Sequence, residues 1–190
     1  MSAFEHSTNW VVITGAPSSG KTSVIENLRA RGYAVQAEVA RELIEECLRR
    51  GLTAEDVRRD GGKQLQKDIL RIKSEREASL DPSIPVFMDR GMPDSMTYFR
   101  LAGLDVAMAR QACMMFHYAA VFIFDRLPFV KDGIRVEDEA AAQKIDEMLR
   151  ADYQSLGYRP TSVPVMSVAE RSDFILQTLS LPLQVRAAAS

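Results

Sequence analysis

The stretch VVITGAPSSGKTSV, residues 11–24, decides the fold expected for this chain. A short apolar run enters a turn that contains two glycines, and a lysine and a threonine follow. Gly15, Gly20, Lys21 and Thr22 occupy the fixed positions of the pattern G-x-x-x-x-G-K-[ST]. The alternative is a coincidental glycine turn, but all four positions match and the flanking patterns are those of a strand before and a helix after. The stretch therefore predicts a loop that binds nucleotide phosphates.

Each residue type in this loop has a physical role. Glycines let the backbone turn so that successive N–H groups point at phosphate oxygens, and the following helix presents its positive end to the same anion. We expect Lys21 to reach the terminal phosphates and the Thr22 hydroxyl to bind Mg²⁺. The predicted nucleotide contacts are Gly15, Ala16, Pro17, Ser18, Ser19, Gly20, Lys21, Thr22 and Ser23.

The composition is that of an ordinary globular protein. The chain has 190 residues, of which 46% are hydrophobic and 26% charged, and its net charge is −2. We expect one domain over residues 1–190 and, without a broad basic field, no nucleic-acid partner. No run is long enough to span a bilayer and the first residues lack a signal-peptide core, so we expect a cytoplasmic protein without membrane insertion. A homodimer stays open.

Apolar runs and helical patterns alternate along the chain. Strand-like runs lie at 10–14, 84–88, 119–124 and 162–166, with a weaker one at 33–38, and helical patterns lie at 21–31, 39–50, 64–80 and 139–156. Ser167 and Glu170 form a capping box that opens a last helix. This alternation predicts a parallel α/β sheet with right-handed crossovers. We place the core at 10–180, a helical substrate region at about 39–83 and a frayed tail at 181–190.

The segment VFMDRGMPDS, residues 86–95, supplies a first candidate cluster. Asp89 ends a buried strand, and ligands of open α/β sheets bind outside the carboxyl ends of strands. A carboxylate there can hold Mg²⁺ or its water, and the Arg90 guanidinium can meet a phosphate or the substrate. A turn with a surface salt bridge is the alternative. The phosphate loop favours the functional interpretation of Asp89 and Arg90.

The segment QAEVARELIEE, residues 36–46, places Glu38 after the weak second strand and Arg41 three residues later. Glu38 can accept a proton from a substrate hydroxyl or hold the hydration shell of Mg²⁺. Its alternative role is an acidic residue that interacts with the helix dipole. The sequence leaves these two roles open.

The segment DRLPFVKDGIRVED, residues 125–138, suits a lid at about 126–138 that closes cations over a transferring phosphoryl group. Arg126 is a predicted nucleotide contact, and Arg135 is the predicted transition-state contact. The alternative is a solvated loop in which Lys131 and the arginines pair with neighbouring acids. We also expect Arg171, in the last helix, to approach the adenine.

The order of these motifs resembles the nucleoside and nucleotide kinase group of P-loop proteins. Within it, the sequence is most similar to the nicotinamide riboside kinase-like, or ATPase-like AAA, group. The resemblance implies a three-layer α/β/α fold with a five-stranded parallel sheet of order 2-3-1-4-5. It also implies ATP with Mg²⁺, and transfer of the γ-phosphoryl group to a small-molecule acceptor with a hydroxyl, such as a nucleoside. Glu38 stands where these enzymes place a carboxylate that acts as a base.

Two function classes follow. The first is a kinase in which the catalytic residues are Lys21, Asp89, Arg135, Glu38 and Arg90, with Mg²⁺ bound by Thr22 and Asp89. The second is a nucleotide-dependent regulatory ATPase, or switch, that binds a protein or lipid partner. The chain has no N-K-x-D guanine-reading motif, which favours ATP over GTP. Two carboxylates near one phosphate site favour the kinase.

Overall fold

The computed structural model describes residues 4–57, 59–126 and 136–183, and in 136–139 the backbone alone. Most of the predicted lid, including Lys131 and Arg135, therefore lies outside the described residues, as do residues 184–190 of the predicted tail. Within the described ranges, none of the helices is long and apolar enough to cross a bilayer. The elements are β1 (His6–Ser7), β2 (Val11–Thr14), α1 (Lys21–Ala30), β3 (Ala34–Gln36), α2 (Val39–Arg49), α3 (Ala54–Val57), α4 (Lys63–Ser79), β4 (Val86–Asp89), α5 (Asp94–Leu101), α6 (Ala107–Ala112), β5 (Phe116–His117), β6 (Ala120–Phe124), α7 (Val136–Ser155), β7 (Thr161–Val163) and α8 (Val168–Thr178).

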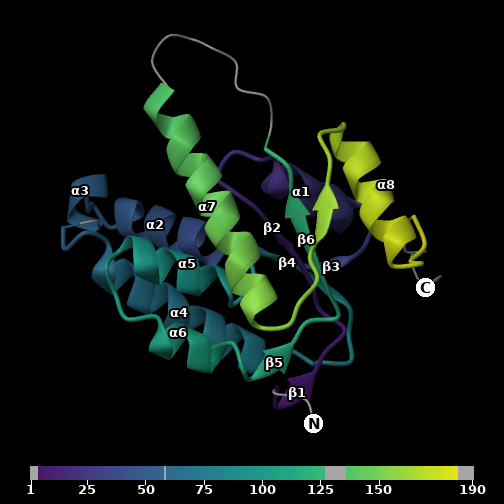
Figure 1. The fold of residues 1–190 in the computed structure, drawn as a ribbon, viewed down its shortest axis with the longest axis horizontal. Coiled ribbons are helices and arrows are strands. Elements are labelled where there is room, and N and C mark those ends of the chain that lie inside the picture. The colour runs from purple at the N-terminus through teal and green to yellow at the C-terminus, as the bar shows by residue number, and fades with distance from the viewer. Residues whose placement is uncertain (1–3, 58, 127–135, 184–190) are drawn as a thin grey trace.

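A parallel sheet of five strands forms the centre of the molecule (Figure 1). Its order is β3-β4-β2-β6-β7, and every neighbouring pair is parallel. Counted in chain order within this sheet, these are the second, third, first, fourth and fifth strands, so the α/β fold class and the order 2-3-1-4-5 are confirmed. The labels differ because β1 and β5 form a separate two-stranded sheet that the sequence did not predict.

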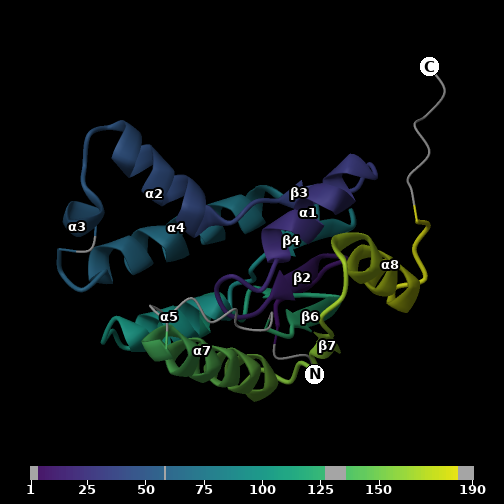
Figure 2. The same ribbon diagram turned by 90° about the horizontal axis from the view of Figure 1, so that it is seen from above.

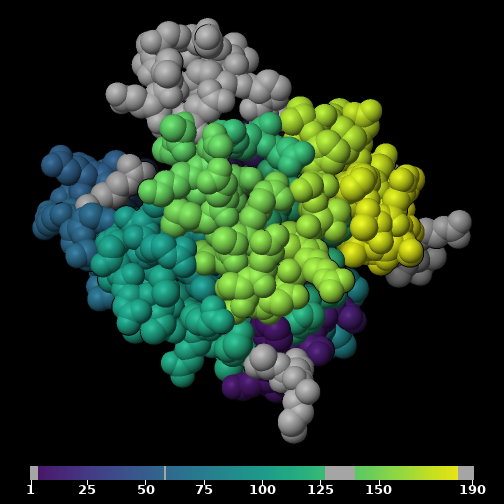
Figure 3. All heavy atoms as spheres, in the orientation of Figure 1, coloured from purple at the N-terminus to yellow at the C-terminus, as the bar shows by residue number. Residues whose placement is uncertain are grey.

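Helices cover both faces of the sheet, because successive residues of a strand point to opposite sides. Val12 and Met88 face a core that α4, α5, α6 and α7 cover, whereas Ile13 and Phe87 face a core that α1 and α8 cover. Figure 2 shows α8 and α7 on different sides of the sheet, and Figure 3 shows the side chains of α7 spread over one face. Strands buried on both faces carry continuous apolar runs rather than alternating ones, as the sequence does.

The predicted substrate region consists of three helices. Helices α2 and α4 pack against each other, and the short α3 joins them at the end away from the sheet (Figure 2). Helix α4 also packs against α5 and on one face of the sheet, so it connects this region with the core. A ligand bound between α2 and α4 would therefore lie beside the carboxyl edge of the sheet.

The end of the described chain is held to the body of the domain. The predicted capping box opens α8: the Ser167 side chain accepts from the Glu170 N–H, and the Glu170 carboxylate accepts from the Ser167 N–H. After α8, the Leu181 N–H donates to the Leu176 carbonyl at 2.8 Å, and Leu181 packs on the core beneath α1 and α8. The Tyr33 hydroxyl donates to the Pro182 carbonyl. The first residues of the predicted tail are thus ordered by specific contacts.

Candidate functional site

Four parallel strands bring the predicted residues to one edge of the sheet. The loop of residues 15–20 follows β2, Glu38 follows β3, Asp89 ends β4 and Arg126 follows β6. A cavity of about 760 Å³ opens at this edge. The phosphate loop and the start of α1 line this cavity, and so do Glu38 and Arg90. Helices α2, α4 and α5 line the rest of the cavity, through Ala40, Arg41, Ile44, Leu65, Gln66, Ile69 and Tyr98.

The phosphate loop has backbone conformations that its sequence allows. Gly15 has φ +140°, and a Cβ at this position would lie 2.9 Å from the carbonyl oxygen of Phe124 in β6. Ser18 (φ 62°) and Gly20 (φ 87°, the N-cap of α1) are left-handed. Left-handed residues within such a loop turn successive N–H groups to one side, which creates an anion-binding concavity. The loop is therefore shaped for phosphate before any side chain is considered.

Lys21 is buried at the base of the loop. Its Nζ donates to the Ala16 carbonyl at 2.8 Å and to the Ser19 hydroxyl at 3.2 Å. Burial, together with the nearby Arg90 cation, lowers the pKa of Lys21 to about 7. A buried ammonium group costs free energy unless an anion compensates it. Lys21 is thus held where phosphate oxygens would restore its charge.

Thr22 and Asp89 form a pair suited to Mg²⁺. The Thr22 hydroxyl donates to Asp89 Oδ2 at 3.2 Å, and Asp89 is 4% exposed. Asp89 Oδ1 is buried and has no hydrogen-bond partner among the described residues. Burial and the neighbouring Glu38 charge raise the pKa of Asp89. Buried unpaired carboxylate oxygens are rare, and hydroxyl and carboxylate oxygens are the ligands that Mg²⁺ prefers, so these residues fit the ion.

Arg90 joins the loop to two carboxylates. Its Nε donates to Glu38 Oε1 at 2.7 Å, and its Nη1 donates to Asp94 Oδ1 at 3.0 Å and to the Gly15 carbonyl at 3.1 Å. The guanidinium also lies over the Tyr98 ring, 5.3 Å from its centroid. Arg90 has φ 72°, a conformation that is strained for a side chain of this size and that clusters at functional sites. Its visible role is to position Glu38 and the phosphate loop.

Asp94 is a residue of this network that the sequence analysis missed. It is 1% exposed and accepts from the Thr14 hydroxyl at 2.6 Å and from the Tyr153 hydroxyl at 2.6 Å, besides Arg90. Burial alone would raise its pKa, but the Arg90 and Lys73 charges lower it below the usual range. Helical spacing gave no signal for the pair, because Arg90 has φ 72° and lies before α5, which begins at Asp94. Asp94 links β2, α5 and α7 to the Arg90 side chain.

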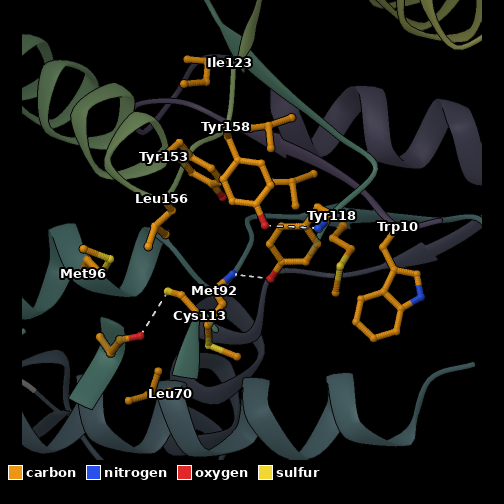
Figure 4. Close-up of a cluster of buried hydrophobic side chains, with 14 of the residues drawn as sticks. Trp10, Leu70, Met92, Met96, Cys113, Tyr118, Ile123, Tyr153, Leu156 and Tyr158 are labelled. Carbon is orange, nitrogen blue, oxygen red and sulfur yellow. Dashed lines mark hydrogen bonds between the residues drawn. The ribbon is translucent and has the colours of Figure 1, made fainter. Parts of the chain in front are cut away.

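A second buried network lies behind the loop of residues 90–93. From α4, Lys73 donates to the Gly91 carbonyl, and Glu77 accepts from the Tyr118 hydroxyl at 2.8 Å. Tyr118 in turn accepts from the Met92 N–H at 2.8 Å (Figure 4). A Cβ on Gly91 would lie 2.7 Å from the Tyr153 hydroxyl, so only glycine fits there. This network fixes the loop that carries Arg90 to α4.

The Glu77 carboxyl gives the protein a pH-dependent stability. Burial raises its pKa from 4.5 to about 7, so the folded protein binds this proton more tightly than the unfolded chain does. The resulting stabilisation is complete below pH 4.5 and is lost as the pH rises through 7. We expect the free energy of unfolding of the wild type to fall by about 3 kcal/mol relative to Glu77→Gln between pH 5 and pH 8. Urea unfolding at several pH values measures it.

The control for this prediction is Glu75→Gln. Glu75 lies on the same helix, but its side chain is 62% exposed and pairs with Arg71. Its pH profile should run parallel to that of the wild type. Parallel profiles for Glu77→Gln as well would contradict the prediction.

Arg171 lies under the phosphate loop, not at the cavity. It is 2% exposed, and its Nη1 donates to the Ser19 carbonyl at 2.6 Å, its Nε to the Pro164 carbonyl at 3.0 Å and its Nη2 to the Asp125 carbonyl at 3.4 Å. It also stacks on Phe124, 4.8 Å from the ring centroid. Arg171 thus braces the phosphate loop against the ends of β6 and β7, and its expected approach to adenine stays a prediction. Burial lowers the pKa of Arg171.

A family model described as an AAA domain matches residues 10–171, which include every element of the five-stranded sheet. The chain belongs to the AAA domain family. The matched range begins one residue before β2 and ends within α8, so it includes the phosphate loop, Glu38, Asp89 and Arg90. No curated protein matches the sequence significantly.

Several solved structures share the fold of this AAA domain. A NadR protein in complex with NR is 16% identical with a TM-score of 0.69, over 95% of this chain and 54% of that one. A NadR protein in complex with NAD and AMP-PNP is 13% identical with a TM-score of 0.68, over 96% and 52%. Thymidylate kinase from Ehrlichia chaffeensis is 13% identical with a TM-score of 0.61, over 93% and 100%. The chain spans about half the length of the NadR chains. At these identities the similarity shows a shared fold alone.

Proposed function

We propose that this AAA domain protein is a Mg²⁺-dependent kinase that transfers the γ-phosphoryl group of ATP to a small-molecule acceptor. One observation carries the proposal: the phosphate loop and Glu38 line the same cavity as the apolar side chains of α2 and α4. Its volume of about 760 Å³ is in the range of small-molecule sites. A protein that bound nucleotide alone would not need an apolar wall beyond the terminal phosphate.

Each residue of the site has a separate proposed role in phosphoryl transfer. Lys21 and the N–H groups of the loop would hold the β- and γ-phosphates and stabilise the charge of the transition state. Thr22 and Asp89 would hold Mg²⁺, which neutralises phosphate charge when bound. An acceptor oxygen forms a bond to the γ-phosphorus while the bond from that phosphorus to the β–γ bridging oxygen breaks, and ADP leaves.

In this proposal Glu38 acts on the acceptor. Arg90 orients it through Oε1, whereas Oε2 has no hydrogen-bond partner among the described residues, and the side chain is 21% exposed. When the acceptor oxygen is a hydroxyl, Glu38 takes its proton. Arg90, with both neighbouring carboxylates paired to it, positions this base rather than the phosphate.

The test is ADP formation from MgATP with and without nucleosides, nucleotides, sugars and pantothenate. We expect one class of compound to stimulate ADP formation strongly and to become phosphorylated, as mass spectrometry would show. Glu38→Gln should lower the stimulated rate by about 10²-fold or more and leave the basal rate unchanged. Glu42→Gln is the control, since Glu42 lies on the same helix and pairs with Arg76 outside the cavity lining. Nucleotide binding without stimulation by any class would instead favour a regulatory ATPase.

A further inference from the structure

Arg41 differs from the other described arginines of the helical region at residues 39–83. Each of those others has a carboxylate partner: Arg49 and Arg50 pair with Glu46, Arg59 with Asp56, Arg71 with Glu75, and Arg76 with Glu42. Arg41 has no ion pair and no hydrogen bond from its side chain to any residue in the described ranges. It instead lines the 760 Å³ cavity that the phosphate loop also lines.

The missing partner of Arg41 is not explained by a lack of nearby acids. Glu45 lies four residues further along α2, at the spacing that brings helical side chains together, yet the described structure contains no ion pair between them. Arg41 also stands in the first turn of α2, where the helix dipole disfavours a cation. Neither local pairing nor helix stability therefore accounts for an arginine at this position.

The other cations of the cavity are already engaged. Lys21 donates to the phosphate loop, and Arg90 donates to Glu38, Asp94 and Gly15. On the facing helix α4, the Gln66 side chain also lines the cavity and has no hydrogen-bond partner among the described residues. We call the part of the cavity that α2 and α4 line the acceptor end. It thus offers one unpaired guanidinium and one unpaired amide, as far as the described ranges extend.

We propose that the acceptor is an anion whose phosphate monoester or carboxylate group is bound by Arg41. This inference rests on the proposed kinase function and names the acceptor class. A guanidinium binds such groups through two parallel N–H···O bonds, and Gln66 adds a donor from the facing helix. The apolar body of the acceptor lies against Ile44, Leu65 and Ile69, and its reacting oxygen faces Glu38 and the γ-phosphate. Arg41 is exposed, so a neutral nucleoside would leave its guanidinium with water as its partner, whereas an anionic group would form an ion pair with it.

Matched pairs of compounds test this proposal. Uridine 5′-monophosphate is compared with uridine, and pantothenate with panthenol, in ADP formation and in calorimetry on protein saturated with Mg²⁺ and a non-hydrolysable ATP analogue. Saturation keeps the phosphate loop filled, so heat reports the acceptor end. We expect the anionic member of at least one pair to stimulate and bind, and its neutral partner to do so at least about 10-fold less. The pair that responds distinguishes phosphate from carboxylate.

Variants then assign the effect to Arg41. Arg41→Ala should raise the KM of the anionic acceptor by about 10- to 100-fold and remove the preference over its neutral partner. Arg41→Lys should keep part of the preference for the anionic acceptor, because lysine retains the charge but cannot donate two parallel N–H···O bonds. Arg49→Ala, an exposed arginine of the same helix, is the control.

Three results would overturn the inference. Equal stimulation by neutral and anionic members would leave the kinase function intact and remove the anionic acceptor. An anionic preference that persists unchanged in Arg41→Ala would remove Arg41 as its cause. No stimulation by any compound, with MgATP still bound, would overturn the proposed function and this inference together.

Discussion

Lys21→Ala should lower ADP formation from MgATP by about 10³-fold or more. The Nζ atom of Lys21 is fixed at the base of the phosphate loop by Ala16 and Ser19, where the terminal phosphates of a nucleotide would lie. Its loss removes a full charge from a water-poor site, in which electrostatic stabilisation is strongest. Coupled ADP detection measures the rate, and calorimetry with MgATP measures the binding.

The same lysine should make the ligand-free protein less stable. Burial lowers its pKa from 10.5 to about 7, so the unfolded chain binds the proton more tightly than the folded protein does. The contribution of this lysine to stability is complete above pH 10.5 and is lost as the pH falls through 7. Lys21→Met, which keeps the length without the charge, should therefore be more stable than the wild type at pH 6, and its advantage should shrink by about 3 kcal/mol between pH 6 and pH 9.

This pair of readouts separates function from folding. A variant that had lost activity by unfolding would lose stability as well, whereas we expect Lys21→Met to lose activity, as Lys21→Ala does, and to gain stability at pH 6. Lys67→Ala, an exposed lysine of α4, should change neither. Wild-type rates in Lys21→Ala would refute both the phosphate site and the kinase.

The elements that the sequence predicted are those with a local signal. The strands β2, β4 and β6 are apolar runs buried on both faces, and α1, α2, α4 and α8 carry periodic apolar residues or caps. Strands β1 and β5 have two residues each and exist through pairing with each other, across more than a hundred residues of sequence. Such long-range pairing has no local signature. Helix α5 was not predicted because its buried face includes the polar residues Asp94, Ser95 and Thr97, which interrupt the apolar pattern of a helix.

The residues of the candidate site differ in the same respect, since some have a local signal in the sequence and others do not. The phosphate loop, Glu38 and Asp89 are visible in sequence because ligands gather at the carboxyl ends of parallel strands. Nothing in the helical pattern at 64–80 distinguishes Lys73 and Glu77 from exposed charges, since charged residues on a helix are ordinarily exposed. The structure buries both: Lys73 donates to the Gly91 carbonyl, and Glu77 accepts from Tyr118, which itself accepts from the Met92 N–H of the same loop. Their positions depend on tertiary contacts, which spacing alone does not encode.

Asp89→Asn should lower MgATP turnover by about 10²-fold and raise the Mg²⁺ concentration needed for half-maximal nucleotide binding by a similar factor. An amide oxygen carries no full charge, so the asparagine of this variant would compete poorly with water for the ion, and its NH₂ group would meet the Thr22 hydroxyl. Calorimetry with ATP at several Mg²⁺ concentrations measures the shift. Asp125→Asn is the control: Asp125 lies at the same edge after β6 and pairs with Arg150.

The stability of Asp89→Asn decides whether the residue is kept for its ligand or for the fold. Burial and the Glu38 charge raise the pKa of Asp89, so the ionised form costs the folded protein free energy, a cost that grows as the pH rises through the folded pKa. Removing the charge should therefore leave the ligand-free protein at least as stable as the wild type at pH 8. A loss of stability together with an unchanged Mg²⁺ requirement would show that Asp89 serves the fold through Thr22. Retained stability with a shifted requirement would mean that Asp89 Oδ1 is kept unpaired within the described structure at a cost in folding that Mg²⁺ binding offsets.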